Sequence, residues 1–123
     1  MSIDDPILRL LLSLEPLPDD GTADVGFEDL LPAVKSGEPA AKKALVKQYL
    51  RVVVWFVRES GPVTSMDHYL DLIHAGNLGV LSAAQQFEPS IGMEFPAYVR
   101  LRISNSIKVF RQKESIGSLS SPD

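Results

Sequence analysis

Between residues 95 and 113, an aromatic ring and several basic side chains recur at helical spacing. One strip, with members spaced i, i+3, i+4 and i+7, combines a ring, an apolar side chain and a cation: Tyr98, Leu101, Arg102 and Asn105. A neighbouring flank is basic and consists of Arg100, Lys108 and Arg111. Cations attract phosphates and rings stack on bases, so the pattern indicates binding of a single strand of nucleic acid. An ordinary amphipathic helix with snorkelling arginines would account for the same residues.

A second patterned stretch, LDLIHAGNLGV, runs from Leu70 to Val80 and carries two glycines within one expected helix. Glycine costs about 1 kcal/mol relative to alanine in a helix interior, so the pair indicates close approach of a neighbouring backbone. One side of this helix can be buried through Leu72, Ile73, Gly76, Gly79, Val80 and Ala83. The other side carries Asp71, His74, Asn77 and Leu81. It is either a contact surface or a solvated polar face.

Catalytic chemistry has little basis in this sequence. His68 and His74 lie six residues apart, which is poor spacing for a metal pair on a helix. No phosphate-binding glycine loop and no serine elbow occurs. We therefore expect no enzyme activity, no catalytic residue, no metal and no cofactor.

Composition favours one domain with two differently charged ends. The chain has 123 residues, 45% of them hydrophobic, and no cysteine, which excludes disulfides and thiolate sites. Its net charge of -4 is uneven: residues 1–41 hold two basic and nine acidic side chains, whereas residues 93–123 hold five basic and three acidic ones. Such surfaces suit different partners. The apolar run VVVWFV is far too short to cross a membrane, so we expect a cytoplasmic protein with no membrane contact.

Proline, glycine and capping residues divide the chain into expected helices. Asp5 and Pro6 can open a short leucine-rich helix, and residues 15–26 resemble a flexible linker. Further helices are expected at 27–38, 39–60, 66–87 and 95–113. Their inward positions include Leu45, Val52 and Phe56, and, in the last helix, Phe95, Val99, Ile103, Ile107 and Phe110.

Nothing in the chain alternates with period two over a useful length, so the predicted fold is an all-α compact helical bundle. The predicted organisation is an acidic leader over 1–26, a helical domain over 27–113 and a polar, disordered tail over 114–123.

Four consecutive stretches resemble region 2 of the sigma-70 family of bacterial transcription initiation factors. LLPAVKSGEPAAKKALVKQYLRVVVWFV is similar to the family's first helices, and LDLIHAGNLGVLSAAQQFEP is similar to its polymerase-binding helix. SIGMEF is similar to the following turn, and FPAYVRLRISNSI to the DNA-melting helix. The resemblance covers about two-thirds of the chain, from about Leu30 to Phe110.

The resemblance implies two partners. In the family, the polar face of the second stretch docks on the clamp helices of the RNA polymerase beta-prime subunit. This role would fall to Asp71, His74, Asn77 and Leu81, with Gly76 and Gly79 shaping the helix. Promoter DNA of the minus-ten region would contact Tyr98, Arg100, Leu101, Arg102, Asn105, Lys108 and Arg111. Tyr98 matches the aromatic residue that stacks on a flipped base.

The chain also departs from the family pattern. His74 replaces the usual glutamine, and Leu101 and Arg102 replace the tryptophan pair of primary factors. Nothing after Lys113 resembles the later regions, so minus-thirty-five recognition is expected from a partner chain or from a longer factor. Two alternatives remain open. One is a sigma mimic or adaptor that binds polymerase or an anti-sigma factor without DNA, and the other is a repurposed helical interaction domain.

Overall fold

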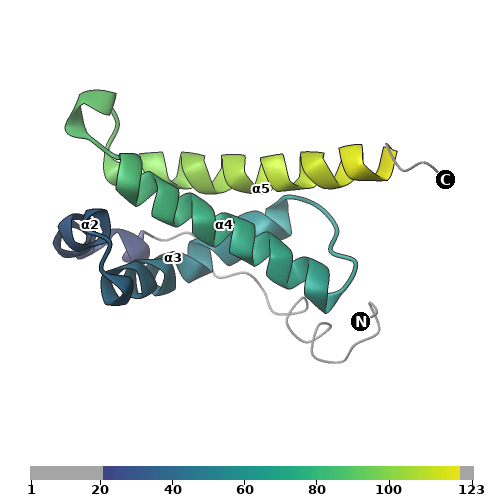
Figure 1. The fold of residues 1–123 in the computed structure, drawn as a ribbon, viewed down its shortest axis with the longest axis horizontal. Coiled ribbons are helices and arrows are strands. Elements are labelled where there is room, and N and C mark those ends of the chain that lie inside the picture. The colour runs from purple at the N-terminus through teal and green to yellow at the C-terminus, as the bar shows by residue number, and fades with distance from the viewer. Residues whose placement is uncertain (1–20, 120–123) are drawn as a thin grey trace.

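The computed structural model describes residues 21–119, and residues 1–20 and 120–123 lie outside this described part. All regular elements within residues 21–119 are helical (Figure 1). In chain order they are η1 Thr22–Asp24, α2 Phe27–Lys35, α3 Pro39–Glu59, α4 Met66–Gln86, η2 Pro89–Ile91 and α5 Phe95–Leu119. The predicted all-α fold is confirmed.

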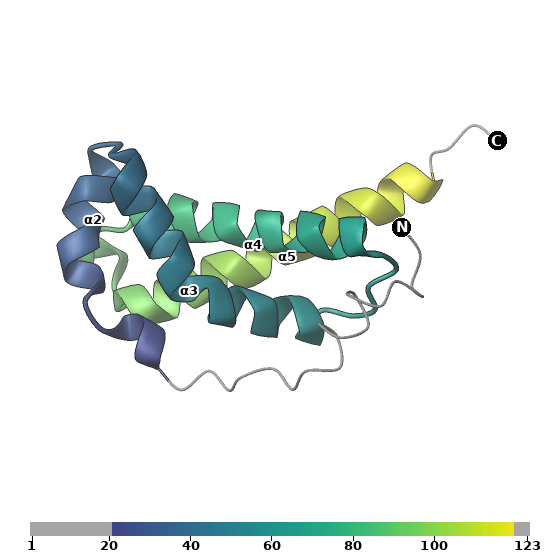
Figure 2. The ribbon, with the colours of Figure 1, turned by 90° about the horizontal axis from the view of Figure 1, so that it is seen from below.

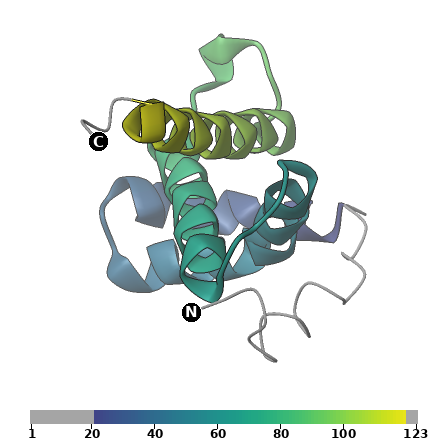
Figure 3. The same cartoon turned by 90° about the vertical axis from the view of Figure 1, so that its right-hand side faces the viewer.

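The long helices α3, α4 and α5 pack against one another. Helix α4 contacts both α3 and α5, and Figure 3 shows α5 lying across the other two. Helix α2 packs on α3 and α4 at one end of the bundle (Figure 2). The result is a bundle in which α4 is the central element.

Local sequence signals set the bounds of these helices. Pro39 is the first residue of α3, where its missing N–H costs no hydrogen bond, and Gly61-Pro62 follows the end of that helix. Ser65 caps α4, because its hydroxyl accepts a hydrogen bond from the His68 backbone N–H at 3.1 Å. The predicted boundaries of α3 and α4 are therefore confirmed to within a residue.

The core is built from apolar side chains of all three long helices. Its fully buried members include Leu45, Tyr49, Val53, Leu72, Val80, Val99, Ile103 and Ile107. Aromatic rings gather where α5 begins: the centroid of Phe95 lies 5.0 Å from that of Phe27 and 5.3 Å from that of Phe87. This cluster joins α2 and the turn after α4 to the start of α5. The predicted inward stripe of α5 is confirmed, with Phe110 partly buried at its end.

The expectation of a flexible linker is wrong for residues 21–26. Ala23 is buried, and the Gln48 side-chain amide donates to the carbonyl oxygens of Ala23 and Val25. The Tyr49 hydroxyl also donates to Asp24 Oδ1 at 2.9 Å. The Pro, Asp and Gly content of this segment predicts turns, but it does not show whether the turns are mobile. Here η1 packs on α3. The leucine-rich segment that begins at Asp5 lies outside the described residues.

The expectation of a disordered tail is wrong for residues 114–119, because α5 continues to Leu119. Glu114 lies 2.9 Å from His68 Nε2 and so ties the last turns of α5 to the start of α4. The polar composition after Lys113 gave no sign of this long-range contact. Within residues 21–119, no helix has the length and hydropathy needed to span a bilayer.

Candidate functional site

The two glycines of α4 are required by packing inside the bundle. A Cβ atom at Gly79 would lie 2.8 Å from the Arg102 carbonyl oxygen and 3.0 Å from Ile103 Cα, both in the backbone of α5. A Cβ atom at Gly76 would lie 2.5 Å from Val53 Cγ1 of α3. The predicted close approach is therefore present and is made by helices of the same chain. An external partner is not needed to explain either glycine.

The side of α4 that faces away from the core carries the predicted polar residues. Asp71 and His74 are exposed, whereas Asn77 and Leu81 are only partly exposed. Asn77 Oδ1 is buried and has no hydrogen-bond partner in the described part of the chain. That oxygen cannot accept a bond from a docking partner unless the side chain moves. The four residues thus share a face, but they are unequally accessible.

Two leucines complete the outer face of α4, and the sequence pattern had not assigned them to a contact surface. Leu70 is 53% exposed and Leu78 is 51% exposed. With His74 they follow an i, i+4, i+8 spacing, so they form one row along the helix. The spacing was visible in the sequence, but only the burial of the opposite side shows that this row faces solvent. The outer face of α4 is thus apolar and polar in alternation rather than simply polar.

The predicted stacking ring of α5 lies inside the aromatic cluster. Tyr98 is only 9% exposed, and its ring centroid lies 5.8 Å from that of Phe87. The guanidinium carbon of Arg102 lies 5.9 Å from the same ring centroid, in a cation–π contact. A nucleic-acid base cannot stack on this ring in the described conformation unless the neighbouring side chains give way.

The arginines of α5 all make contacts within the chain. Arg100 Nη1 lies 2.9 Å from Asp24 Oδ1, and Arg102 donates to the Ser82 hydroxyl. Arg111 donates to the Ser60 hydroxyl at 2.8 Å and to the carbonyl oxygens of Gly61 and Pro62. The predicted basic flank therefore contributes to tertiary structure as well as to surface charge.

The exposed stripe of α5 is smaller than the predicted DNA-binding set. Its members are Leu101, Asn105 and Lys108 at i, i+4 and i+7. Leu101 is 46% exposed, so this stripe offers an apolar contact, an amide and one cation. A ligand could reach these three side chains without rearrangement.

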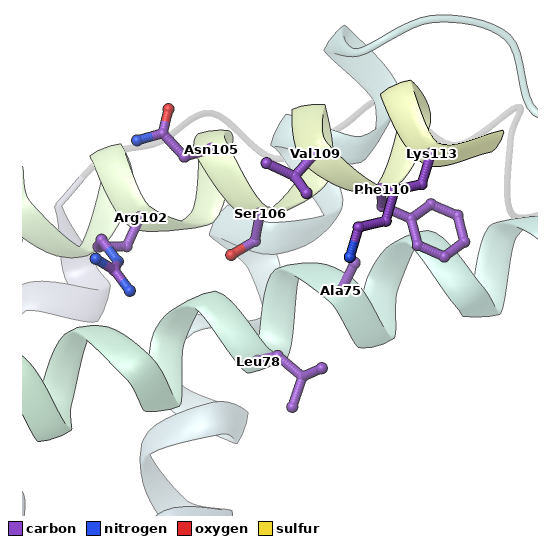
Figure 4. Close-up of a pocket in the computed structure, with 8 residues that line it drawn as sticks. All are labelled: Ala75, Leu78, Arg102, Asn105, Ser106, Val109, Phe110 and Lys113. Carbon is purple, nitrogen blue, oxygen red and sulfur yellow. The ribbon is translucent and has the colours of Figure 1, made fainter. Parts of the chain in front are cut away.

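Two grooves flank this stripe. The α4/α5 groove is lined by apolar and polar side chains of both helices: Ala75, Leu78, Arg102, Asn105, Ser106, Val109, Phe110 and Lys113. Figure 4 shows Arg102 and Ser106 directed toward α4 and Asn105 directed away from it. The α3/α5 groove lies on the other flank and includes Trp55, Ile107 and Lys108.

Titratable groups give little indication of acid–base chemistry. Burial raises the pKa of the Tyr69 phenol, and the nearby Arg58 cation partly opposes that shift. Among residues 21–119, no three acidic or histidine side chains are grouped as they would be to hold a metal ion.

A family model for sigma-70 region 2 matches residues 45–115, which span most of α3, all of α4 and most of α5. The RNA polymerase sigma factor RpoS of Coxiella burnetii is 35% identical over 94 residues, covering 69% of this chain and 26% of that protein. SigA of Clostridium acetobutylicum is 31% identical over 107 residues, covering 87% of this chain and 27% of that protein.

SigA2 of Synechococcus elongatus is 32% identical over 102 residues, and the match covers 31% of its length. The matched part of this chain thus corresponds to between about a quarter and a third of each of these sigma factors. The family model covers more than half of the present sequence and coincides with its packed helices. The chain therefore belongs to the sigma-70 family, whose region 2 it carries.

Proposed function

We propose that this protein acts in transcription initiation by docking α4 on RNA polymerase core and presenting α5 to promoter DNA. Docking would use the clamp helices of the beta-prime subunit, as the family resemblance implies. The observation that carries the proposal is the outer face of α4, where Leu70 and Leu78 are about half exposed beside Asp71 and His74. Fully burying an exposed leucine side chain is worth about 1.5 to 3 kcal/mol, so burying the exposed half of each of these leucines would contribute roughly half of that.

The internal packing of α4 supports this assignment. Gly76 and Gly79 hold the inner face tightly against α3 and α5, so the outer face is presented on a rigid support. A preformed surface loses little conformational entropy on binding. Asp71 and His74 would then set the orientation of the partner, and the two leucines would supply most of the buried apolar area.

Binding to purified RNA polymerase core tests the docking step. The chain is expected to bind core saturably, and Asp71→Arg is expected to weaken binding by about tenfold or more, because a charge reversal at an interface costs several kcal/mol when unpaired. Glu28→Arg on α2 is the matched control, because it makes the same charge reversal at an exposed acidic residue of another helix. Equal affinity of the wild-type and Asp71→Arg chains would remove α4 from the interface.

The DNA step is proposed for the exposed stripe of α5. Leu101, Asn105 and Lys108 would contact the minus-ten region, while Tyr98 and Arg102 would join only if their mutual contact and the Phe87 contact open. A labelled single-stranded oligonucleotide of the minus-ten region, added to the chain with core, measures this binding. Lys108→Ala should lower affinity and reduce its salt dependence.

A second candidate function is favoured by the contacts of the arginines. Arg100 and Arg111 are held inside the chain and Tyr98 is buried, as would suit an adaptor that binds polymerase or an anti-sigma factor without touching DNA. Binding to core without any binding to the oligonucleotide would favour this candidate over the first.

A further inference from the structure

The groove between α3 and α5 combines aromatic rings with cations. It is lined on the α3 side by Trp55 and Phe56 and on the α5 side by Ile107, Lys108 and Arg111. This groove lies on the flank of α5 opposite the one shown in Figure 4. None of the residues on its α3 side belongs to the surfaces assigned above.

Trp55 supplies an aromatic surface at this groove. Its side chain is only partly buried, and its ring meets that of Phe56 edge to face, with centroids 5.1 Å apart. Phe56 is packed against the core and so fixes the position of Trp55 from one side. A partly exposed tryptophan held in this way is a stacking platform, because an aromatic ring can stack on any base.

The positive charges at the groove are not neutralised by an ion pair among the described residues, although Arg111 donates hydrogen bonds within the chain. Arg111 is held by three uncharged oxygens, from Ser60, Gly61 and Pro62, and forms no ion pair with any residue in 21–119. Lys108 is exposed beside it. Glu59 is the one carboxylate among the lining residues, so the groove retains a net positive charge. Excess positive charge suits a phosphate backbone.

We propose that the α3/α5 groove is a second contact site for single-stranded nucleic acid, in which a base stacks on Trp55 and phosphates lie beside Lys108 and Arg111. The inference rests on the proposed function of α5, and it extends that function onto α3. Lys108 provides continuity, because it belongs both to the exposed stripe of α5 and to this groove. A nucleic-acid strand that crosses the exposed stripe can therefore enter the groove while its phosphates stay close to Lys108.

Trp55 is the single tryptophan of the chain, so its fluorescence reports directly on the groove. Addition of an unlabelled 12-residue oligothymidylate to the full chain at low salt should quench this fluorescence saturably, because stacking brings a base against the indole. The quenching should weaken as salt rises. A duplex of the same length, whose bases are already paired and stacked, should quench much less.

Affinity is measured separately by the anisotropy of a labelled copy of the same oligonucleotide. Trp55→Ala should lower affinity by about tenfold, whereas Trp55→Phe, which keeps a ring, should lower it by about threefold or less. Lys108→Ala should also weaken binding. Lys113→Ala is the matched control, because it removes the same charge from the same helix at the other groove. Thermal melts of all variants verify that they remain folded.

The outcomes separate this inference from the proposed function. Binding of the oligonucleotide with unchanged Trp55 fluorescence and no effect of Trp55→Ala would overturn the groove site and leave the α5 stripe as the contact. Absence of oligonucleotide binding by the free chain would overturn the groove site. The proposed α5 contact is tested separately, with the chain bound to polymerase core, and binding to core tests α4. Equal losses in Lys108→Ala and Lys113→Ala would also contradict the groove, since charge alone would then explain the binding.

Discussion

Helices α4 and α5 were both expected to carry binding surfaces, but their predicted contact residues differ in how exposed they are in the folded chain. On α4, the predicted contact residues Asp71 and His74 remain exposed, and two half-exposed leucines lie beside them. On α5, Arg100, Arg102 and Arg111 make contacts inside the chain, and Tyr98 is buried. Helix α4 thus has an exposed contact face, whereas α5 has a narrow exposed stripe beside side chains that already make contacts within the chain.

The difference follows from the residue types on the two helices. Gly76 and Gly79 let α4 approach α3 and α5 closely, while Asp71 and His74 stay on its outer face. The arginines of α5 are long and have several donors, so they reach neighbouring carbonyls, hydroxyls and one carboxylate. A cationic pattern in a sequence therefore overstates the charge that is free to meet a ligand.

The largest effect is expected on the exposed face of α4. Leu78→Asp places a charge where an apolar side chain would be buried by polymerase core, and we expect affinity for core to fall by about a hundredfold. Leu50→Asp on α3, at a leucine that is 40% exposed, is the matched control. Affinities measured by biolayer interferometry check the difference. Equal losses in the two variants would mean that general charge, and not the α4 face, controls binding.

The next effect concerns the inner face of the same helix. Gly79→Ala brings a methyl group against the backbone of α5, so we expect a loss of about 2 kcal/mol in the free energy of unfolding despite the better helix propensity of alanine. Urea denaturation followed by circular dichroism measures it.

Gly76→Ala provides the comparison for that variant. Its methyl group would meet the Val53 side chain, so Val53→Ala should be less damaging in the Gly76→Ala background than in the wild type. The same truncation should not relieve Gly79→Ala, whose obstacle is backbone. If Val53→Ala rescued both variants equally, the two glycines would not face different helices.

A smaller effect is expected where α5 is tied to η1. Asp24→Asn removes the partner charge of Arg100 and weakens a contact whose side chains are about one-fifth exposed, so we expect a loss of about 1 kcal/mol in stability. Arg100 would then be freer to meet a phosphate, and affinity for single-stranded DNA at low salt should rise about twofold to threefold. Glu28→Gln, an exposed acidic residue of α2, controls for the change in net charge. Unchanged DNA affinity in Asp24→Asn would contradict the expected gain from loosening Arg100.

The smallest effect is expected at high pH. Burial raises the pKa of the Tyr69 phenol above its ordinary value of about 10, so the protonated phenol is favoured in the folded state. The associated stability is fully present below pH 10 and is lost as pH rises through the folded-state pKa. Tyr69→Phe cannot ionise, so its melting temperature should fall less steeply above pH 10 than that of the wild type. An equal fall in melting temperature for Tyr69→Phe and the wild type above pH 10 would contradict the raised pKa of the Tyr69 phenol.

Much of the fold could be predicted because its signals are local. Pro39, Ser65 and Gly61-Pro62 act on their own backbone, and they set the bounds of α3 and α4 as expected. The inward stripe from Phe95 to Ile107 follows from helical period alone. By contrast, the turn at Thr22–Asp24 and the last turns of α5 depend on contacts with Gln48, Tyr49 and His68 far away in the chain. The residues next to these segments in the sequence give no indication of such long-range contacts.

By itself, the sequence determined the helical class, the order of the helices, the family resemblance and the common face of Asp71 and His74, because periodicity and capping are properties of neighbouring residues. Tertiary structure alone decided that Gly79 meets the backbone of α5, that Tyr98 is buried and that Arg111 binds the loop after α3. It also decided that Trp55 lies at a groove beside Lys108. These are facts of packing, and packing depends on which residues distant in the chain come to share one space.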